Sequence, residues 1–205
     1  MPKTAVQLQF DHLVKQLLWP LFKERGYQKT GANFRYYDPE GWGKILNIQK
    51  GQFSNHKSIR FTLNTGLYLP ETERLWLRSG KIAGEKFLEP DCLIRKRIGD
   101  LKDSQQDSWY ELEEQREPAI LLHRVQQDVR DYVLPYFDRI QGLDDILQQL
   151  QQERYPNSIL AIKTLFAYGY RQPAREWVEH ELATTIYRRQ REEMQALQVE
   201  LEALG

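Results

Sequence analysis

The segment SIRFTLNTGLYLP, residues 58 to 70, alternates between two sets of side chains over its whole length. The apolar set contains Ile59, Phe61, Leu63, Thr65, Leu67 and Leu69, and the other set contains Arg60, Thr62, Asn64, Gly66 and Tyr68. Successive side chains of a β-strand point to opposite faces of a sheet, so a period of two residues is typical of a strand. The segment predicts a half-buried strand, and it requires the chain to build a sheet with a core on one side.

Four further segments have strand character: 33–38, 43–51, 92–101 and 108–113. Their short connections favour antiparallel pairing. Apolar residues recur every three or four positions in 5–24 and again from Pro118 to the end, which predicts helices. The sequence thus predicts an α+β fold with an antiparallel sheet of four to five strands, packed by an N-terminal helix and a C-terminal helical segment. We expect an α+β domain over 1–150 and a helical hairpin appendage over 151–205.

The composition narrows the class of protein. The chain has 29 basic and 29 acidic residues, so no overall field attracts nucleic acid or an anionic membrane. Its one cysteine, Cys92, excludes a disulfide framework and a multi-cysteine zinc site. A run of about 18 apolar residues, the minimum for a membrane-spanning helix, does not occur. We therefore expect a cytoplasmic protein with no membrane partner. Nucleic acid is disfavoured as a partner, and a local basic patch stays open because charge balance does not fix the distribution of charge.

The segment CLIRKRIGDL, residues 92 to 101, places cations inside an apolar strand pattern. If it is a strand, Ile94 and Ile98 face the core, and Arg95 and Arg97 lie together on the other face, about 7 Å apart. Two guanidinium groups on one rigid face can bind a carboxylate or phosphate. With the nearby Trp109, they form the candidate anion- or partner-binding site. The alternative is that this is an ordinary solvated sheet face, or that the arginines form ion pairs with a neighbouring strand, for example with Glu111 or Glu113.

No established catalytic motif occurs in the sequence. The four histidines are scattered, and no glycine-rich phosphate loop or nucleophile motif occurs. The sequence therefore predicts no metal, no cofactor and no catalytic residue. It favours a non-catalytic binding or interaction module that recognises a protein partner or an anionic ligand. An enzyme acting on a phosphorylated or nucleic-acid substrate stays open as an alternative, with Glu85, Glu89 or Asp91 as the base.

The C-terminal residues suggest a second kind of function. Residues 173 to 204 read as one long helix, and Met194, Leu197, Leu201 and Leu204 form a short apolar seam on it. A helix of that length extends beyond a domain of this size. The seam predicts a homodimer or partner contact through Met194, Leu197 and Leu201. An assembly protein that dimerises through its C-terminal helices is therefore another alternative.

Several stretches taken together carry a family resemblance. They are KERGYQKTGANFRY, NIQKGQ, RFTLNTGLYLP, CLIRKRIGDL, and a W-x-x-L strand from Trp109 to Leu112. In this order they resemble the bacterial family catalogued as domain of unknown function 4304, over about residues 8 to 150. The resemblance implies an α+β domain in a bacterial cytosolic protein and implies no activity. An accessory role in toxin neutralisation or genome defence is an analogy suggested by a small neutral domain without an active site.

Overall fold

A computed structural model describes residues 2–76, 86–102, 107–153 and 158–204. The chain forms two compact units. The first unit comprises Met1–Tyr68 and Lys86–Leu143, and the second comprises Leu69–Glu85 and Asp144–Gly205. The first unit contains the sheet, and the second is helical.

The sheet of the first unit has six antiparallel strands among the described residues. They are β1 (Gln28–Thr30), β2 (Asn33–Tyr37), β3 (Gly43–Lys50), β4 (Ser58–Tyr68), β5 (Ile94–Arg97) and β6 (Tyr110–Glu113). The order is β1-β2-β3-β4-β5, and β6 also pairs with β4. The predicted α+β class with an antiparallel sheet is confirmed. Strand β1 was not predicted, because QKT carries no apolar alternation.

Strand β4 is the centre of the sheet rather than a half-buried strand. Phe61, Leu63 and Leu67 are fully buried, as the alternation predicts. Thr62 and Asn64, on the opposite face, are buried as well. The reason is that β3 runs along one side of β4, while β6 and β5 pair with successive halves of its other side. On this second face Thr62 donates to the Ser108 carbonyl and Asn64 donates to Gln49, while the 86–92 segment covers one end of the face.

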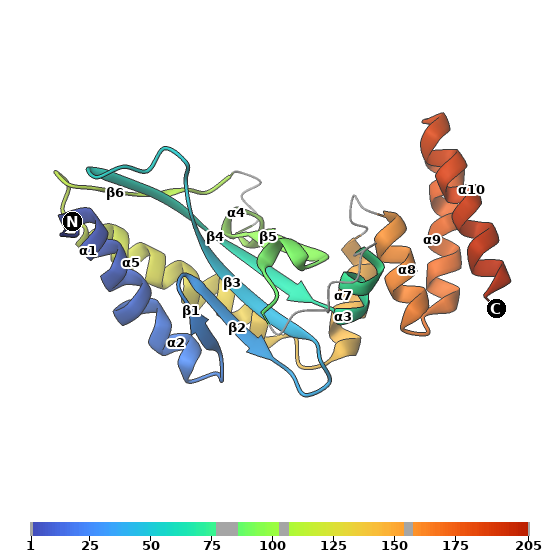
Figure 1. Cartoon of the computed structure of the whole chain (residues 1–205), viewed down its shortest axis with the longest axis horizontal. Coiled ribbons are helices and arrows are strands. Elements are labelled where there is room, and N and C mark those ends of the chain that lie inside the picture. The colour runs from blue at the N-terminus through green and yellow to red at the C-terminus, as the bar shows by residue number, and fades with distance from the viewer. Residues whose placement is uncertain (1, 77–85, 103–106, 154–157, 205) are drawn as a thin grey trace. The chain divides into compact units, whose positions relative to one another are not determined.

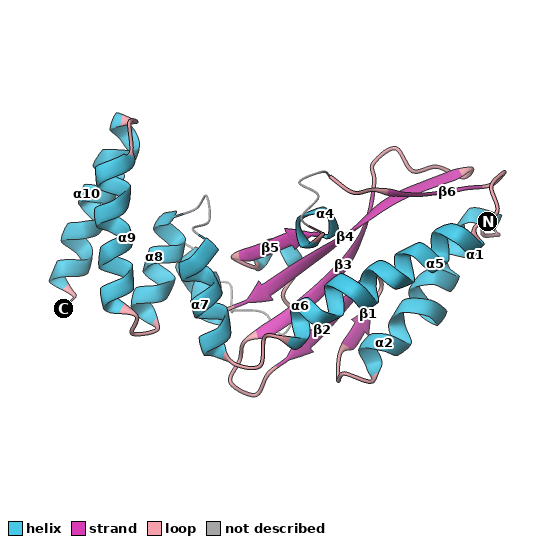
Figure 2. Ribbon diagram, turned by 180° about the vertical axis from the view of Figure 1, so that it is seen from behind, coloured by secondary structure: helices cyan, strands magenta, loops and turns pink. Residues whose placement is uncertain are grey.

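Two long helical segments cover one face of the sheet (Figures 1 and 2). The first consists of α1 (Ala5–His12), the π-helical turn η1 (Leu13–Leu18) and α2 (Trp19–Lys23). The second consists of α5 (Ala119–Asp128), the π-helical turn η3 (Val129–Val133) and α6 (Leu134–Asp138). Aromatic contacts join the first segment to the sheet, with Phe10 against Phe61 at 5.3 Å and Phe22 against Phe34 at 5.2 Å between ring centroids. The second segment is joined to β6 by a hydrogen bond from Tyr110 to Asp128.

Each long segment widens just before a proline. The Trp19 amide donates to the carbonyl of Val14, five residues back, and Pro20 follows. Likewise the Leu134 amide donates to the carbonyl of Val129, and Pro135 follows. A proline ring clashes with the carbonyl four residues earlier, and a π-helical turn moves that carbonyl away. Pro20 was expected to kink or divide this helix, but its effect is a local widening that leaves the helical segment continuous.

The opposite face of the sheet is covered at one end only. The short 3₁₀ turn η2 (Glu89–Asp91) and the residues just before it lie on β3 and β4, where Phe87 stacks on Tyr68 at 4.2 Å. Two strand glycines allow this close approach. A Cβ at Gly43 would lie 2.7 Å from the Phe87 ring, and one at Gly66 would lie 2.7 Å from Sγ of Cys92. The rest of that face carries polar side chains.

The strand predicted over 92–101 is shorter in the structure. β5 ends at Arg97, and Ile98–Leu101 form the helical turn α4. The Arg97 amide donates to the Asp100 carboxylate at 2.8 Å, which caps this turn. The segment 102–107 was expected to join two strands as a hairpin. Its residues 103–106 lie outside the described residues, and both β5 and β6 pair with β4.

The second unit contains α3 (Pro70–Trp76), α7 (Leu143–Glu153), α8 (Ser158–Ala167), α9 (Arg171–Thr184) and α10 (Arg188–Ala203). Helix α3 packs on α8, where the hydroxyls of Thr72 and Thr164 lie 3.0 Å apart. Within the described ranges, no helix is long and apolar enough to cross a membrane.

The prediction of a single helix over 173–204 is wrong. The chain leaves the helix at Thr185, in extended geometry, and returns as α10 antiparallel to α9. Consequently Met194, Leu197 and Leu201 are buried against the chain's own helices. This burial removes the reason for assigning the seam to a second chain. The β-branched residues Thr184, Thr185 and Ile186 mark the break, because such side chains are crowded within a helix.

Candidate functional site: the polar sheet face

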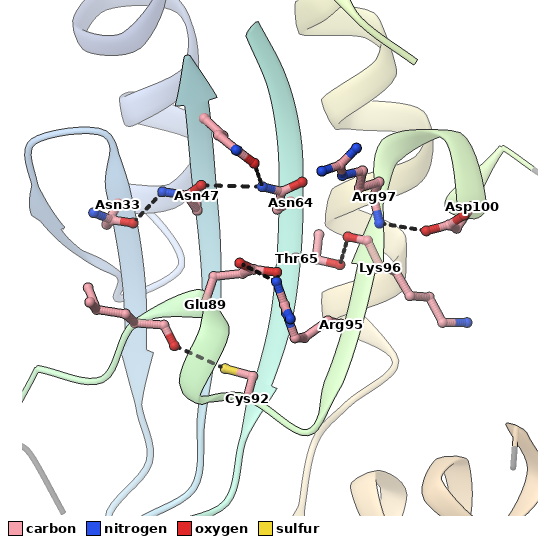
Figure 3. A network of polar contacts seen from close by, with 12 residues as sticks. Asn33, Asn47, Asn64, Thr65, Glu89, Cys92, Arg95, Lys96, Arg97 and Asp100 are labelled. Atoms are coloured by element: carbon pink, nitrogen blue, oxygen red, sulfur yellow. Dashed lines mark hydrogen bonds and ion pairs between the residues drawn. The ribbon is translucent and has the colours of Figure 1, made fainter. Parts of the chain in front are cut away.

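A row of side-chain amides crosses the uncovered part of the sheet, from β2 to β4 (Figure 3). Asn47 donates to the Asn33 oxygen at 2.8 Å. Asn64 donates to the Gln49 oxygen at 2.7 Å and, more weakly, to the Asn47 oxygen at 3.4 Å. These residues occupy alternate positions on neighbouring strands, so the pleat of the sheet directs them to one face. We call Asn33, Asn47, Gln49, Asn64, Arg95 and Arg97 the polar face.

Arg95 extends the polar face on β5, and its guanidinium is held by Glu89 of η2. Nε lies 2.7 Å from one Glu89 oxygen, and Nη2 lies 3.1 Å from the other. The Glu89 side chain is only 8% exposed, whereas that of Arg95 is 50% exposed. The hydrogen bonds to Glu89 raise the pKa of Arg95 above its usual value. This two-point pair fixes η2 to β5, because a buried carboxylate requires its partner.

Arg97 lies beside Asn64, its register partner on β4. Its Nη1 lies 2.7 Å from Oδ1 of Asp107, and the indole nitrogen of Trp109 donates to the other Asp107 oxygen at 2.8 Å. The guanidinium carbons of Arg60 and Arg97 lie 4.9 and 5.7 Å from the Trp109 ring centroid. The hydrogen bond from Arg97, and then that from Trp109, lower the pKa of Asp107.

A shallow depression of about 310 Å³ lies over this region. It is lined by Asn33, Asn47, Gln49, Leu88, Glu89, Pro90, Arg95 and Arg97. The lining presents amide donors, amide acceptors and guanidinium groups from a rigid sheet. Such a surface can form many directional hydrogen bonds with a ligand that lies across it.

The structure places Arg95 and Arg97 on one face and Trp109 beside Arg97. Their carboxylate partners are Glu89 and Asp107, which come from connecting segments, rather than the expected Glu111 or Glu113 of β6. The four amide residues were missed by the sequence analysis. Their signal was the recurrence of Asn and Gln at alternate strand positions, in NIQ of β3 and at Asn64 of β4.

The carboxylates proposed as a catalytic base do not converge on the arginines as a reactive set. Glu89 is engaged by Arg95, and Asp91 accepts the Leu88 amide at 2.6 Å. Glu85 lies outside the described residues. All four histidines are exposed, and the described part of the chain holds no group of three or more metal-ligating side chains in coordinating arrangement. Cys92 is buried, and its thiol contacts the Leu88 carbonyl.

The sequence of the chain matches one known protein family. The sequence model of a family described as a domain of unknown function, DUF4304, matches residues 18–139. The chain belongs to the DUF4304 family. Neither the curated proteins nor the solved structures include a match to it. The DUF4304 match spans all six strands together with α5 and α6, so the complete polar face lies within it. Helices α7 to α10 lie beyond the DUF4304 match.

Proposed function

We propose that this DUF4304 protein is a non-catalytic binding module that recognises a protein partner through the polar face. The observation that carries the proposal is the asymmetry of the sheet. One face is sealed by two helical segments, and the other presents an ordered row of amides and arginines around a shallow depression.

The character of the polar face favours a protein over a nucleic acid as the ligand. Each arginine that lines the depression is already paired, Arg95 with Glu89 and Arg97 with Asp107. The surface is therefore polar without a large excess of positive charge, whereas nucleic-acid binding draws its affinity from many unneutralised cations. Amide side chains that both donate and accept suit the peptide groups and polar side chains of another protein.

The same features favour binding over catalysis. A reactive site needs an acid or base within reach of a bound substrate, in addition to charge stabilisation. Glu89 and Asp107, the carboxylates that contact the arginines of the polar face, are instead engaged in ion pairs with them. The depression is open rather than a closed cleft that excludes water.

The direct test is site-specific photocrosslinking of the full chain in cells of its source organism. A photoreactive phenylalanine analogue would replace Gln49, which is exposed on the polar face, or Gln127, which is exposed on α5. Both positions are glutamines, so the pair is matched in size and chemistry. We expect a covalent adduct of one defined mass from position 49 and none from position 127. Adducts from 127 alone, or from neither position, would contradict the proposal.

The mass of the adduct identifies the partner, and the identity of the partner tests the more specific roles, such as toxin neutralisation. A role in toxin neutralisation or defence requires the partner captured at position 49 to be a toxin or a defence factor. A metabolic enzyme or a structural protein captured there would leave the binding module in place and remove that role.

A further inference from the structure

The two arginines of the polar face differ in how their carboxylate partners are held. Glu89 is buried and engages Arg95 through both oxygens, so it belongs to the framework of the fold. Asp107 is exposed over 53% of its side chain and engages Arg97 through a single oxygen. An exposed pair is screened by water and contributes little to stability. The Arg97–Asp107 pair can therefore open while the fold stays intact.

The Asp107 carboxylate is held by a set of donor groups that could bind any other carboxylate. Arg97 supplies a charged donor at 2.7 Å and the Trp109 indole supplies a neutral donor at 2.8 Å, one to each oxygen. Arg60 adds a second cation over the same indole ring. The lowered pKa of Asp107 agrees with this geometry, because these groups favour the ionised form.

We propose that Arg97, Trp109 and Arg60 form a carboxylate-binding site that Asp107 occupies in the free protein, and that an aspartate or glutamate side chain of the protein partner displaces Asp107. This inference rests on the proposed function and assigns the chemistry that the partner must present. Asp107 acts as an internal competitor, so it sets the affinity of the polar face for acidic segments.

Asn64 provides a second, independent pointer to a ligand beside Arg97. It is only 3% exposed, and its amide oxygen has no hydrogen-bond partner among the described residues. Figure 3 shows this oxygen directed toward Arg97.

Gln49 and Arg97, the long side chains that border the Asn64 oxygen, are both accessible to solvent and can move aside. A main-chain N–H next to the partner's acidic residue would satisfy this oxygen, since a buried acceptor without a donor is costly. An acidic side chain within an extended segment therefore fits the site, and the open depression lets such a segment pass across it.

The test uses the indole N–H resonance of Trp109 in the full chain, assigned by comparison with Trp109→Phe. The probe is a capped peptide of alternating aspartate and alanine, and the control peptide carries asparagine in place of aspartate. The variants are Asp107→Ala and the double variant Arg97→Ala with Asp107→Ala. The matched control is Asp138→Ala, because Asp138 and Arg25 form an exposed ion pair of nearly equal accessibility at 3.3 Å.

We expect Asp107→Ala to bind the aspartate peptide at least fivefold more tightly than the unmodified protein. Asp138→Ala should leave the affinity unchanged, and the double variant should abolish binding. Unchanged affinity in Asp107→Ala, or full binding in the double variant, would overturn the inference. So would equal binding of the asparagine peptide. Binding only of a neutral peptide with a free C-terminus would overturn the assignment to an acidic side chain.

A second variant and the crosslinking result distinguish a misfolded protein or a wrong carboxylate site from a wrong proposed function. Should Asp107→Ala fail to fold, Asp107→Asn keeps the shape of the side chain, and the same gain in affinity is expected from it. If the peptide titrations fail while position 49 still crosslinks to a partner, only the carboxylate site is wrong. If position 49 captures no partner, the proposed function itself is wrong.

Discussion

Tyr110 on β6 donates a 2.6 Å hydrogen bond to Asp128 on α5, and Lys102 binds the other oxygen of the same carboxylate at 2.9 Å. Asp128 is buried, so the carboxylate is stabilised within the layer between sheet and helices by these two donors. Burial, followed by the bond to Asp128, raises the pKa of the Tyr110 phenol well above its ordinary value.

We expect Tyr110→Phe to lower the free energy of unfolding by about 1 to 3 kcal/mol, because it removes one donor from a buried charge. Urea denaturation followed by tryptophan fluorescence measures this change. Tyr132→Phe, which alters an exposed tyrosine of the same helical segment, is the control. A loss no larger than that of the control would show that Lys102 alone satisfies Asp128.

Substituting Arg95 should destabilise the protein more than substituting Arg97, although the two residues lie only two positions apart on β5. Arg95→Ala leaves the buried Glu89 without its partner and should cost about 1 to 3 kcal/mol, discounted from a fully buried pair because Arg95 is half exposed. Arg97→Ala breaks an exposed pair and should cost less than about 1 kcal/mol. Thermal unfolding of the two variants compares them directly. Equal losses would contradict the distinction between a structural and an exchangeable arginine.

The Arg97–Asp107 pair should respond to acid in a predictable direction. The folded-state pKa of Asp107 lies below its ordinary value of 3.8, so the pair contributes to stability above about pH 3.8 and loses that contribution as the pH falls through the lowered pKa. The chemical shift of the Trp109 indole proton should titrate with a midpoint below 3.8, and Arg97→Ala should raise this midpoint. A midpoint at or above 3.8 in the unmodified protein would show that the pair does not form in solution.

Three of the four seam residues, Met194, Leu197 and Leu201, are buried by packing within one chain, while Leu204 is exposed. Leu197→Ala should destabilise the second unit by about 2 to 5 kcal/mol, because it removes a fully buried side chain. It should leave the sedimentation coefficient of the folded protein unchanged. Val199→Ala, on an exposed position of the same helix, is the control. A shift from dimer to monomer in Leu197→Ala would restore the seam as an interface between chains.

Sequence patterns predicted those features that follow from the residues of a single segment. The alternation of 58–70 located β4 and its core residues, and Gly26 ended the first helical segment because it adopts a positive φ of 79° there. The pair Arg95 and Arg97 was placed on one face because side-chain direction in a strand follows from residue parity alone.

The remaining features depend on which segments meet in space. The sequence does not show that η2 folds over Gly66, so the burial of the second face of β4 could not be predicted. Glu89 and Asp107 reach the arginines from connecting segments, whose paths are not set by periodicity. The break at Thr185 was not predicted because apolar residues recur at helical spacing on both sides of it, and such spacing does not show a change in chain direction. The amide row was missed because each of its members, taken singly, looks like an ordinary surface residue.

The most direct test of the polar face as the binding site is an affinity measurement. The partner captured at position 49 would be purified, and its dissociation constant measured by calorimetry for the unmodified chain, Gln49→Arg and Gln127→Arg. Gln127→Arg should keep the unfolding temperature of the unmodified chain, because Gln127 is exposed. Gln49→Arg also removes the acceptor of the 2.7 Å hydrogen bond from Asn64, so affinities are compared at a temperature where all three proteins are folded. We predict that Gln49→Arg weakens binding at least tenfold, about 1.4 kcal/mol, while Gln127→Arg binds as tightly as the unmodified chain. Equal affinities for all three, or a loss confined to Gln127→Arg, would contradict a binding role for the polar face.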